Sequence, residues 1–309
     1  MFLDLVLLAT LFVALGVFAD MLVRHVRHIA HALKLRLFVI GIILGVFTTM
    51  PDFAVGLNAI PQGIVSVSGG NLLGGIIVIF GLVLGISLIL HRSILTDGAW
   101  KALIPSIAFI LSPLILAADG SISMYDGMLI LALTGGLIYY LHRTDRRVLA
   151  PDPQRSESGS LPISVLWVMG SLAGILLASN IIVDTSVRVL ENFGVSQFIL
   201  GALIFSIGTN LPEFTIAITS WWRKVPDLSV SHLVSSGLMN VTALGILAIL
   251  AGSITLTTGY GYMILAASMT ITLLMFMLFY RTGYVLSRVE GLYLVGVYCF
   301  FVVGTLLTH

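Results

Sequence analysis

Two carboxylates stand inside long apolar stretches of the sequence, where charged side chains are rare. Asp52 follows Pro51, and Glu213 follows Pro212. A charged side chain at the centre of a lipid bilayer costs about 2.5–3.5 kcal/mol on insertion scales, so such residues usually serve a function. Carboxylates, hydroxyls and backbone carbonyls are hard oxygen donors that suit Ca²⁺ or Na⁺ and not soft metals. The alternative is a pair of structural acids, each hydrogen-bonded to a neighbour.

Both acids belong to a motif that occurs twice. Thr48-Thr49-Met50-Pro51-Asp52-Phe53 parallels Thr209-Asn210-Leu211-Pro212-Glu213-Phe214, and Gly41 and Gly201 each end a similar apolar tetrapeptide upstream. Each proline removes a backbone donor and frees a carbonyl one turn earlier. A helix broken in this way is tolerated at membrane depth only where it faces protein or a wet cavity. The duplication favours a shared cation site over two structural acids.

The composition places this motif in a membrane. Of 309 residues, 58% are hydrophobic and only 9% are charged, whereas soluble domains carry about 25% charged residues. This excludes a soluble enzyme and a nucleic-acid binder with a dense basic face. Cys299 is the single cysteine, which excludes a disulfide scaffold. The chain is predicted to be an integral membrane protein in contact with the lipid bilayer.

Windows of about 20 apolar residues, the length that crosses a bilayer, predict ten spans. They lie near residues 3–23, 37–60, 64–90, 101–118, 126–142, 162–183, 196–220, 229–252, 260–280 and 288–307. With ten spans, fourteen of the 15 basic residues fall on one side, and Arg188 lies on the other. The positive-inside rule makes the basic side cytoplasmic, so both termini are predicted to be extracytoplasmic.

The long polar connector at 143–161 divides the chain into two halves of five spans. We predict a first half at 1–142 with a repeat at about 38–83, a cytoplasmic linker at 143–161, and a second half at 162–309 with a repeat at about 198–245. Because five is odd, the second half enters the membrane in the opposite sense. The predicted fold is an all-α polytopic membrane protein of ten transmembrane helices in two inverted-topology five-helix repeats.

These motifs resemble those of the sodium/calcium exchanger, or cation/calcium antiporter, superfamily. Its repeats carry a Gly-Thr-Ser-Leu-Pro-Glu type motif, followed on the next helix by a Gly-Asn-x-x-Gly-Ser-Asn type motif. Residues 208–213 fit the first motif with asparagine for serine, and 48–52 fit it with aspartate for glutamate. Gly70-Asn71-Leu72-Leu73-Gly74 fits the second motif, while Ser231 and His232 replace its glycine and asparagine in the second half.

The resemblance implies a set of cation ligands. It assigns Ca²⁺ to the carboxylates and to the carbonyls of the nearby threonines, and it assigns serine and asparagine positions to Na⁺. Carried over to this chain, the set is Asp52, Glu213, Thr48, Thr209, Thr49, Asn210, Ser236 and Asn240. Gly75 and Ile79 occupy the first-half positions that correspond to Ser236 and Asn240. The first repeat is therefore degenerate, which puts the binding of several Na⁺ ions in doubt.

The expected function is secondary active antiport without a cofactor, with Ca²⁺ exported in exchange for Na⁺ by alternating access. Exchange of Ca²⁺ or another cation for H⁺ is the alternative, and a cation channel or a non-transporting relative are further possibilities. No His-Glu-x-x-His cluster or intramembrane serine–base pair indicates an enzyme. The compact chain suits a prokaryotic plasma or inner membrane.

Three further features of the sequence allow more than one interpretation. His25, His28 and His31 lie three residues apart among basic residues, which suits either a helix at anionic headgroups or a transition-metal site. Gly69, Gly70, Gly74 and Gly75 cluster in one span, and they indicate either close helix packing or backbone near an ion. His232, by its position, is a candidate for proton coupling or gating.

Overall fold

The computed structural model describes residues 2–33, 37–91, 93–95, 100–144, 160–193, 196–214, 230–256, 260–283 and 285–307. The first half contains α1 Phe2–Ala32, α2 Leu37–Thr48, α3 Met50–Ala59, α4 Val65–Ile77, the π-helical segment η1 Val78–Val83, α5 Leu84–His91, β1 Ser93–Leu95, α6 Trp100–Leu116, the 3-10 turn η2 Ala117–Asp119, β2 Ser121–Ser123 and α7 Met124–Thr144. The second half contains α8 Leu161–Phe193, α9 Gln197–Ile199, the π-helical segment η4 Leu200–Phe205, α10 Ser206–Thr209, α12 Val230–Ala251, β3 Ser253–Thr255, α13 Tyr260–Gly283, β4 Val285–Ser287 and α14 Arg288–Leu307.

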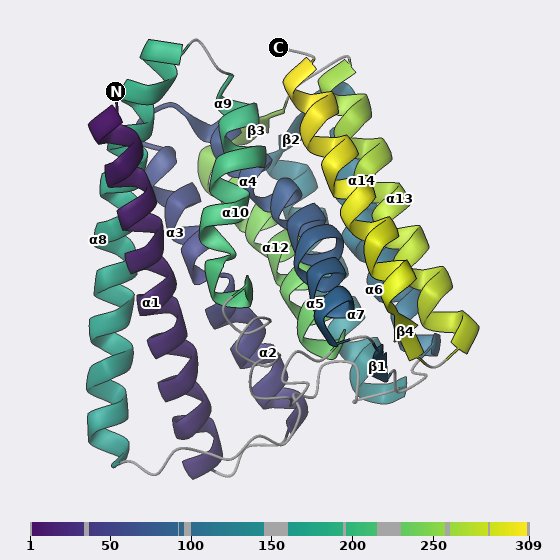
Figure 1. Ribbon diagram of the computed structural model, residues 1–309. Coiled ribbons are helices and arrows are strands. Elements are labelled where there is room, and N and C mark those ends of the chain that lie inside the picture. Colours follow the sequence, from purple (N-terminus) through teal and green to yellow (C-terminus); the bar gives the residue numbers. More distant parts are fainter. Residues whose placement is uncertain are drawn as a thin grey trace.

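The described helices account for the predicted spans. Eight are long and apolar enough to cross a membrane, and the bent pair Ile42–Thr48 and Met50–Ala59 makes a ninth. The apolar helical stretch Gln197–Thr209 is shorter, and the remainder of its predicted span, beyond residue 214, lies outside the described residues. The N- and C-termini lie at the same end of the molecule, the upper end in Figure 1.

Two helices extend further than the apolar windows indicated. α1 continues through residues 24–32, and α8 runs to Phe193. His25 and His28 therefore lie on a helix and not in a connecting loop. Basic side chains at the end of a span can reach the headgroup region without breaking the helix. The linker at 145–159 lies outside the described residues.

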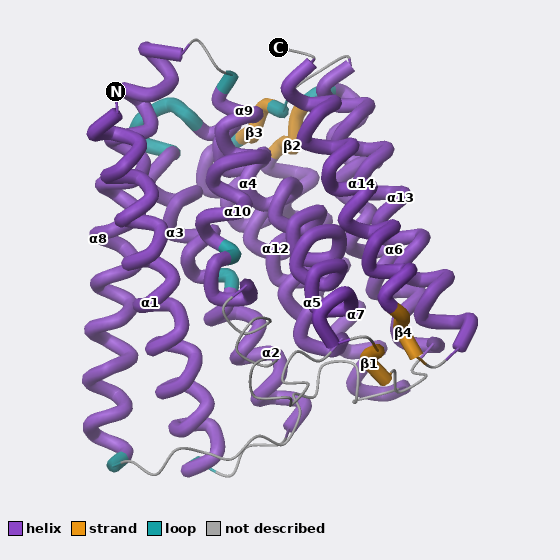
Figure 2. Tube along the Cα trace, in the orientation of Figure 1, coloured by secondary structure: helices purple, strands orange, loops and turns teal. Residues whose placement is uncertain are grey.

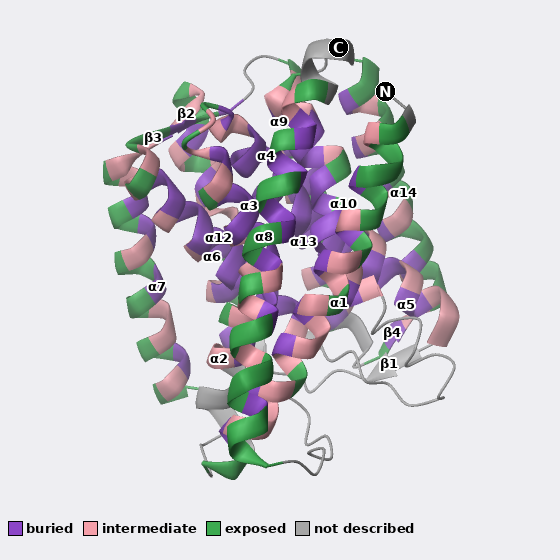
Figure 3. Ribbon diagram, turned by 90° about the vertical axis from the view of Figure 1, so that its left-hand side faces the viewer, coloured by how far each residue is buried: buried purple, intermediate pink, exposed green. Residues whose placement is uncertain are grey.

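The helices form a buried centre and an apolar periphery. In the most apolar 18 residues of Val65–His91 and of His232–Ala251, 83% and 78% of the residues are buried, against 22% in those of Leu161–Arg188. Large apolar side chains such as Leu166 on α8 and Leu292 on α14 are exposed. Figure 3 shows this separation, with exposed residues along α7 and α8 and buried residues toward α4 and α12. In a membrane protein such an outer surface faces lipid.

Glycines allow the central helices to approach closely. A Cβ atom on Gly74 of α4 would lie only 2.5 Å from the carbonyl oxygen of Ala202 in η4, and one on Gly70 would lie 2.9 Å from the Ala202 nitrogen. Gly201 meets the backbone of Val67 in the same interface. Close packing therefore explains Gly70 and Gly74, as it does in many membrane proteins.

Two short strand pairs join the halves at opposite ends of the molecule. β1 pairs with β4 in antiparallel orientation, and β2 pairs with β3; Figure 2 shows one pair at each end. β1 and β3 follow the third long helix of their halves, while β2 and β4 precede the fifth. Each half thus contributes one strand of each kind to opposite ends, which is the arrangement of inverted repeats. The predicted all-α fold thus also contains these four short strands.

A second repeated feature follows β2 and β4. Ser123 and Ser287 precede α7 and α14, and their backbone N–H groups donate to Asp126 at 2.9 Å and to Glu290 at 2.5 Å, three residues later. This is the reciprocal cap that begins many helices. A glycine comes next in each case. Gly127 of α7 packs on Gly245 of α12, and Gly291 of α14 packs on Gly85 of α5, so the same crossing occurs twice, each time between the two halves.

We predict that Gly127→Ala destabilises the protein. The new Cβ would lie 2.5 Å from the carbonyl oxygen of Gly245, and such overpacking costs about 1–3 kcal/mol. Gly136→Ala on the same helix is the matched control, because nothing lies within 4 Å of its Cβ position. The melting temperature in detergent should fall in the first variant only. Equal melting temperatures would contradict the close α7–α12 crossing.

Candidate functional site

The two repeated motifs break their helices at corresponding positions. α2 ends at Thr48 and α3 begins at Met50, with a bend of 47°. In the second half α10 ends at Thr209, Asn210 leaves the helix, and residues 211–214 are helical again. Pro51 is tolerated because it lies at the start of the new helix, where a backbone donor is not required. Each carboxylate therefore lies in the first turn after a break at membrane depth.

Asp52 is held by both halves of the protein. Its side chain is buried, with 3% of its surface exposed. The Oδ1 atom accepts hydrogen bonds from Asn71 Nδ2 on α4 at 2.9 Å and from Thr209 Oγ1 on α10 at 2.8 Å. Two hydrogen bonds to one oxygen fix the orientation of the carboxylate. The first-half acid is thus linked directly to the second-half motif.

Thr209 lies among several oxygens. Besides Asp52, its hydroxyl is 3.1 Å from Asn71 Oδ1 and 2.8 Å from the carbonyl oxygen of Phe205. A hydroxyl has a single proton and donates fully to one acceptor at a time. The oxygens of Asp52, Asn71 and Phe205 are therefore held close together around one hydroxyl. Such a group of oxygens is suited to binding a hard cation. The Phe205 carbonyl belongs to the π-helical segment η4, a type of irregularity that is frequent at functional sites.

Polar side chains from α3, α12 and the end of α10 converge on Gly75 of α4. A Cβ atom on Gly75 would lie 3.1 Å from Asn240 Nδ2, 3.2 Å from Asn210 Nδ2 and 4.0 Å from Asp52 Oδ1. The Asn210 amide is oriented by its hydrogen bond to the carbonyl oxygen of Ser206, at 2.7 Å. Of the four clustered glycines, Gly75 is thus the one that faces the polar site.

Glu213 and Asn240 carry buried polar atoms without hydrogen-bond partners. Glu213 Oε2 and both amide atoms of Asn240 are in this state within the described part of the chain. Glu213 also lies within electrostatic range of Asp52. Buried polar atoms are nearly always paired, so such atoms indicate a missing ligand or water. Glu213 Oε2 and Asn240 Oδ1 could therefore bind a cation without losing a hydrogen bond, whereas Asp52 Oδ1 already accepts two.

The eight predicted ligands differ in how the structure places them. Asp52, Thr209, Asn210 and Asn240 come together around Gly75. The hydroxyls of Thr48 and Thr49 are buried but donate to the Gly45 carbonyl, at 2.9 and 3.0 Å. They bond to their own helix and not to a carboxylate. Ser236 is buried on α12, one turn before Asn240.

Asn71 is the residue that the predicted ligand set omitted. It is fully buried, and it contacts both Asp52 and Thr209. The Gly70-Asn71 pair of the second motif was the available signal, but spacing along a helix does not show which side chain reaches a carboxylate. In the second half, His232 is on α12, within electrostatic range of Arg27 of α1.

The donor set suits a hard cation. Among the described residues, no group of three or more histidine, cysteine, aspartate or glutamate side chains could hold a metal ion. Asp52 and Glu213 are accompanied by neutral oxygens, which suit Ca²⁺ or Na⁺. His25 stacks on Trp167, with 5.8 Å between ring centroids, and its Nδ1 lies 3.4 Å from Ser164 Oγ. Its ring thus packs against α8; the His31 side chain lies outside the described residues.

The chain belongs to the sodium/calcium exchanger family. The family model described as sodium/calcium exchanger protein matches residues 3–142 and 163–307. The chain is 27% identical over 308 residues to the protein CaxA of Alkalimonas amylolytica, covering 92% of this chain and 94% of CaxA. It is thus a cation antiporter family member and a transporter, not an enzyme, as predicted.

Two solved structures have the same fold. A structure of the sodium-calcium exchanger NCX_Mj matches with a TM-score of 0.67 at 21% identity, over 97% of each chain. The H⁺/Ca²⁺ exchanger CAX matches with a TM-score of 0.75 at 15% identity, over 98% of this chain and 86% of CAX. The predicted architecture of ten spans in two inverted repeats is confirmed. The boundaries of the halves at 142 and 162, and the ligand set, stay predictions.

We predict that Asn71 positions Asp52 for cation binding. A hydrogen bond to a charged group contributes about 1.5–3 kcal/mol. The Asn71→Ala protein should therefore need at least about tenfold more Ca²⁺ than the wild type to show the same rise in melting temperature. Asn58→Ala is the control, because Asn58 is an amide of α3 that bonds to Ser179 on α8. An unchanged Ca²⁺ response in Asn71→Ala would exclude the positioning role.

Proposed function

We propose that this protein exports Ca²⁺ in exchange for Na⁺, with Asp52 and Glu213 as the principal ligands near the bilayer midplane. The observation that carries the proposal is the pair of buried acids on corresponding broken helices, one of which has an unpartnered oxygen. Two carboxylates match the charge of one divalent cation. Without a cation, a buried ionised carboxylate lacking donors is strongly disfavoured.

Neutral oxygens complete the proposed ligand set. Thr209 Oγ1 and Asn240 Oδ1 are available as side-chain oxygens, and Thr48, Thr49, Asn210 and Ser236 lie on the same helix breaks or on α12. Pro51 and Pro212 leave the carbonyls of Phe47 and Gly208 without their usual helical donors. Ca²⁺ takes six to eight oxygens in flexible geometry, and such a mixture of carboxylate, hydroxyl and carbonyl groups meets that need.

Alternating access requires a part of the protein that moves relative to the site. α1 and α8 lie side by side at the periphery (Figure 1). α1 contacts the second motif directly, because Phe12 packs on Gly208 and Gly16 packs on Leu211 and Pro212. We infer that these two helices shift against the strand-linked remainder, exposing the carboxylates to each side in turn.

H⁺ is the second candidate for the counter-ion. Gly75 provides no side-chain oxygen, and Ile79 is buried and apolar. Na⁺ is bound through several oxygens, whereas a proton needs only one carboxylate oxygen. The site therefore has fewer neutral Na⁺ ligands in its first half than in its second.

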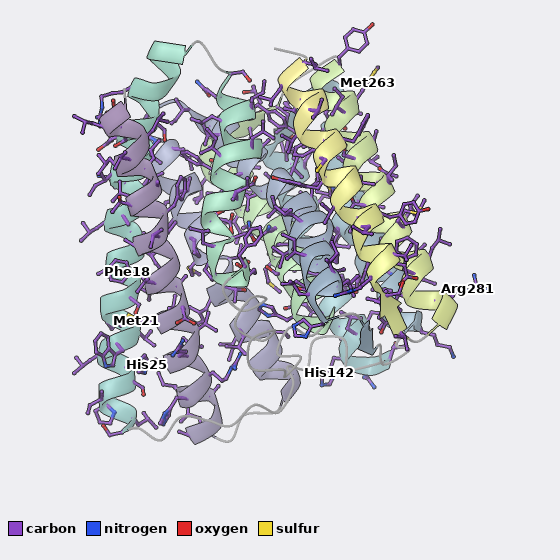
Figure 4. All side chains as sticks on the ribbon, viewed as in Figure 1. Phe18, Met21, His25, His142, Met263 and Arg281 are labelled. Carbon is purple, nitrogen blue, oxygen red and sulfur yellow. The ribbon has the colours of Figure 1, made fainter. Side chains whose placement is uncertain are left out.

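The proposed orientation follows the basic residues. Figure 4 labels His25, His142 and Arg281 toward the lower end of the molecule and Met263 toward the upper end. The positive-inside rule makes the lower end cytoplasmic. Both termini would then be extracytoplasmic and the 143–161 linker cytoplasmic, in a cell membrane of the plasma or inner type.

We predict that Asp52→Asn and Glu213→Gln each abolish Ca²⁺ flux in proteoliposomes. Each change removes a negative charge while keeping the shape of the side chain. Asp184→Asn is the control, because Asp184 is an exposed acid of α8 that bonds to Gln62. Wild-type flux in both site variants would reject the assignment of these carboxylates.

Separately imposed gradients should identify the counter-ion. We expect an outward Na⁺ gradient at constant pH to drive ⁴⁵Ca²⁺ into vesicles against its own gradient, which a channel cannot do. Uptake driven only by a pH gradient would replace Na⁺ with H⁺ in the proposal. If neither gradient moves Ca²⁺ uphill, the chain is a channel or a non-transporting relative.

A further inference from the structure

A groove lies on the outer surface between α13 and α14. Its volume is about 580 Å³, within the range of about 300–1,000 Å³ that is typical of sites for small molecules. Gly296 lines it, and nothing lies within 4 Å of the Cβ position of this glycine. The missing side chain thus leaves the space open. The other lining residues are one tyrosine and apolar side chains, among them Ile271, Val289, Leu292, Tyr293 and Phe300.

The two faces of α14 have different surroundings. One face is buried, with Gly291 packed against α5 and Tyr298 packed against η1. The other face carries the groove, and its Leu292 and Tyr293 are 61% and 63% exposed. α13 and α14 lie side by side, at the side of the molecule away from α1 and α8 (Figure 1). The groove therefore opens toward the lipid and not toward the polar site.

The groove is about as long as one leaflet of a bilayer is thick. Val289 and Phe300 are eleven positions apart on α14, which is about 16 Å at a rise of about 1.5 Å per residue. The hydrocarbon core of a bilayer is about 30 Å thick, so one leaflet contributes about 15 Å of it. Because Val289 is the second residue of α14, the groove runs from the membrane surface to about the midplane. A single acyl chain has this length and needs such an apolar wall.

Arg288 lies at the surface end of the groove, directly before Val289. It is exposed, and its Nε donates to the carbonyl oxygen of Ile89 at 2.8 Å. This bond holds the guanidinium group at the end of the helix. Glu290, the nearest acid in the sequence, accepts the backbone N–H of Ser287 at 2.5 Å and so belongs to the helix cap. The groove therefore has a positive charge at its mouth.

A second arginine lies at the same end. Arg281 is an exposed residue of the last turns of α13. The rings of Phe279 and Tyr293, with 6.4 Å between centroids, place this part of α13 beside the groove. Figure 4 labels Arg281 at the lower end of the molecule, which is cytoplasmic in the proposed orientation. Basic pockets between membrane helices on the cytoplasmic side are suited to anionic lipid headgroups.

We propose that the groove between α13 and α14 binds one anionic phospholipid of the cytoplasmic leaflet. An acyl chain lies along α14, and the phosphate group is held by Arg281 and Arg288, because a guanidinium group can donate two parallel hydrogen bonds to phosphate. The bound lipid stabilises the packing of α14 on α5 and η1, since a ligand of the folded state raises its stability. The inference uses the proposed orientation but not the identity of the transported ions.

The test titrates the purified protein in detergent with dioleoyl phosphatidylglycerol or dioleoyl phosphatidylcholine and counts bound lipids by native mass spectrometry. We expect one phosphatidylglycerol to be retained at a lower concentration than phosphatidylcholine with the same chains. Dihexanoyl phosphatidylglycerol, which has the same headgroup on short chains, should be retained less well than the dioleoyl lipid. Equal retention of the two headgroups, or of the short and long chains, would overturn the inference.

Gly296→Phe places a ring in the groove, and Gly136→Phe on α7 is the matched control because its Cβ position is equally open. The groove variant should lose the retained phosphatidylglycerol, while the control keeps it. Phosphatidylglycerol binding to Gly296→Phe as to the wild type would contradict the site. A dimer that this substitution dissociates would show a second copy of the chain in the groove and would likewise overturn the inference.

Arg288→Gln removes the charge at the mouth of the groove, and Arg143→Gln at the end of α7 is its control. The first variant should need about fivefold more phosphatidylglycerol for the same occupancy, the fold-change that corresponds to about 1 kcal/mol per basic residue at a membrane surface. The control should bind as the wild type does. An unchanged affinity in Arg288→Gln would reject the assignment of the headgroup. All of these measurements are made without an ion gradient, so their outcome is separate from that of the transport experiments.

Discussion

The cost of placing charge in hydrocarbon governs this structure. Two carboxylates that would be unremarkable in water are kept in an interior where a backbone donor, a hydroxyl or an amide must replace the solvent. The fold meets this need with broken helices. Pro51 and Pro212 interrupt their helices next to the acids, and Asn71 and Thr209 supply Asp52 with two donors. Glu213 Oε2 has no such partner in the described residues, so the two acids differ in how far their hydrogen-bonding capacity is used.

The packing of the described helices around this site keeps its side chains buried. Glycines at 74 and 201 bring α4 and η4 into backbone contact, and the crossings at Gly85–Gly291 and Gly127–Gly245 hold the outer helices to the centre. The strand pairs connect the two halves at both ends. α1 and α8 lie outside this framework, with Phe12 packed on Gly208. The proposed alternating access uses this separation between a framework and a helix pair, because the site must be exposed to one side at a time.

The asymmetry between the halves has a physical consequence that the repeat alone does not indicate. Gly75 in the first half has no side chain, and two asparagines of the second half extend toward it. The two copies of the motif thus meet in a single polar cluster in which the second half provides most of the neutral polar groups.

The sequence by itself determined the membrane class, the ten spans, the inverted halves and the two acids, because hydrophobic length, charge distribution and a repeated proline–carboxylate motif are local properties of the chain. It also identified Asn210 and Asn240 as polar positions. Only the tertiary structure decided that Asn71 holds Asp52, that the hydroxyls of Thr48 and Thr49 bond to their own helix, and that Gly75 faces two amides. It also brought together the strands and helix caps that repeat in both halves. These contacts join residues up to 194 positions apart, as with Ser93 and Ser287, and their geometry is set by how the helices pack rather than by spacing along any one of them.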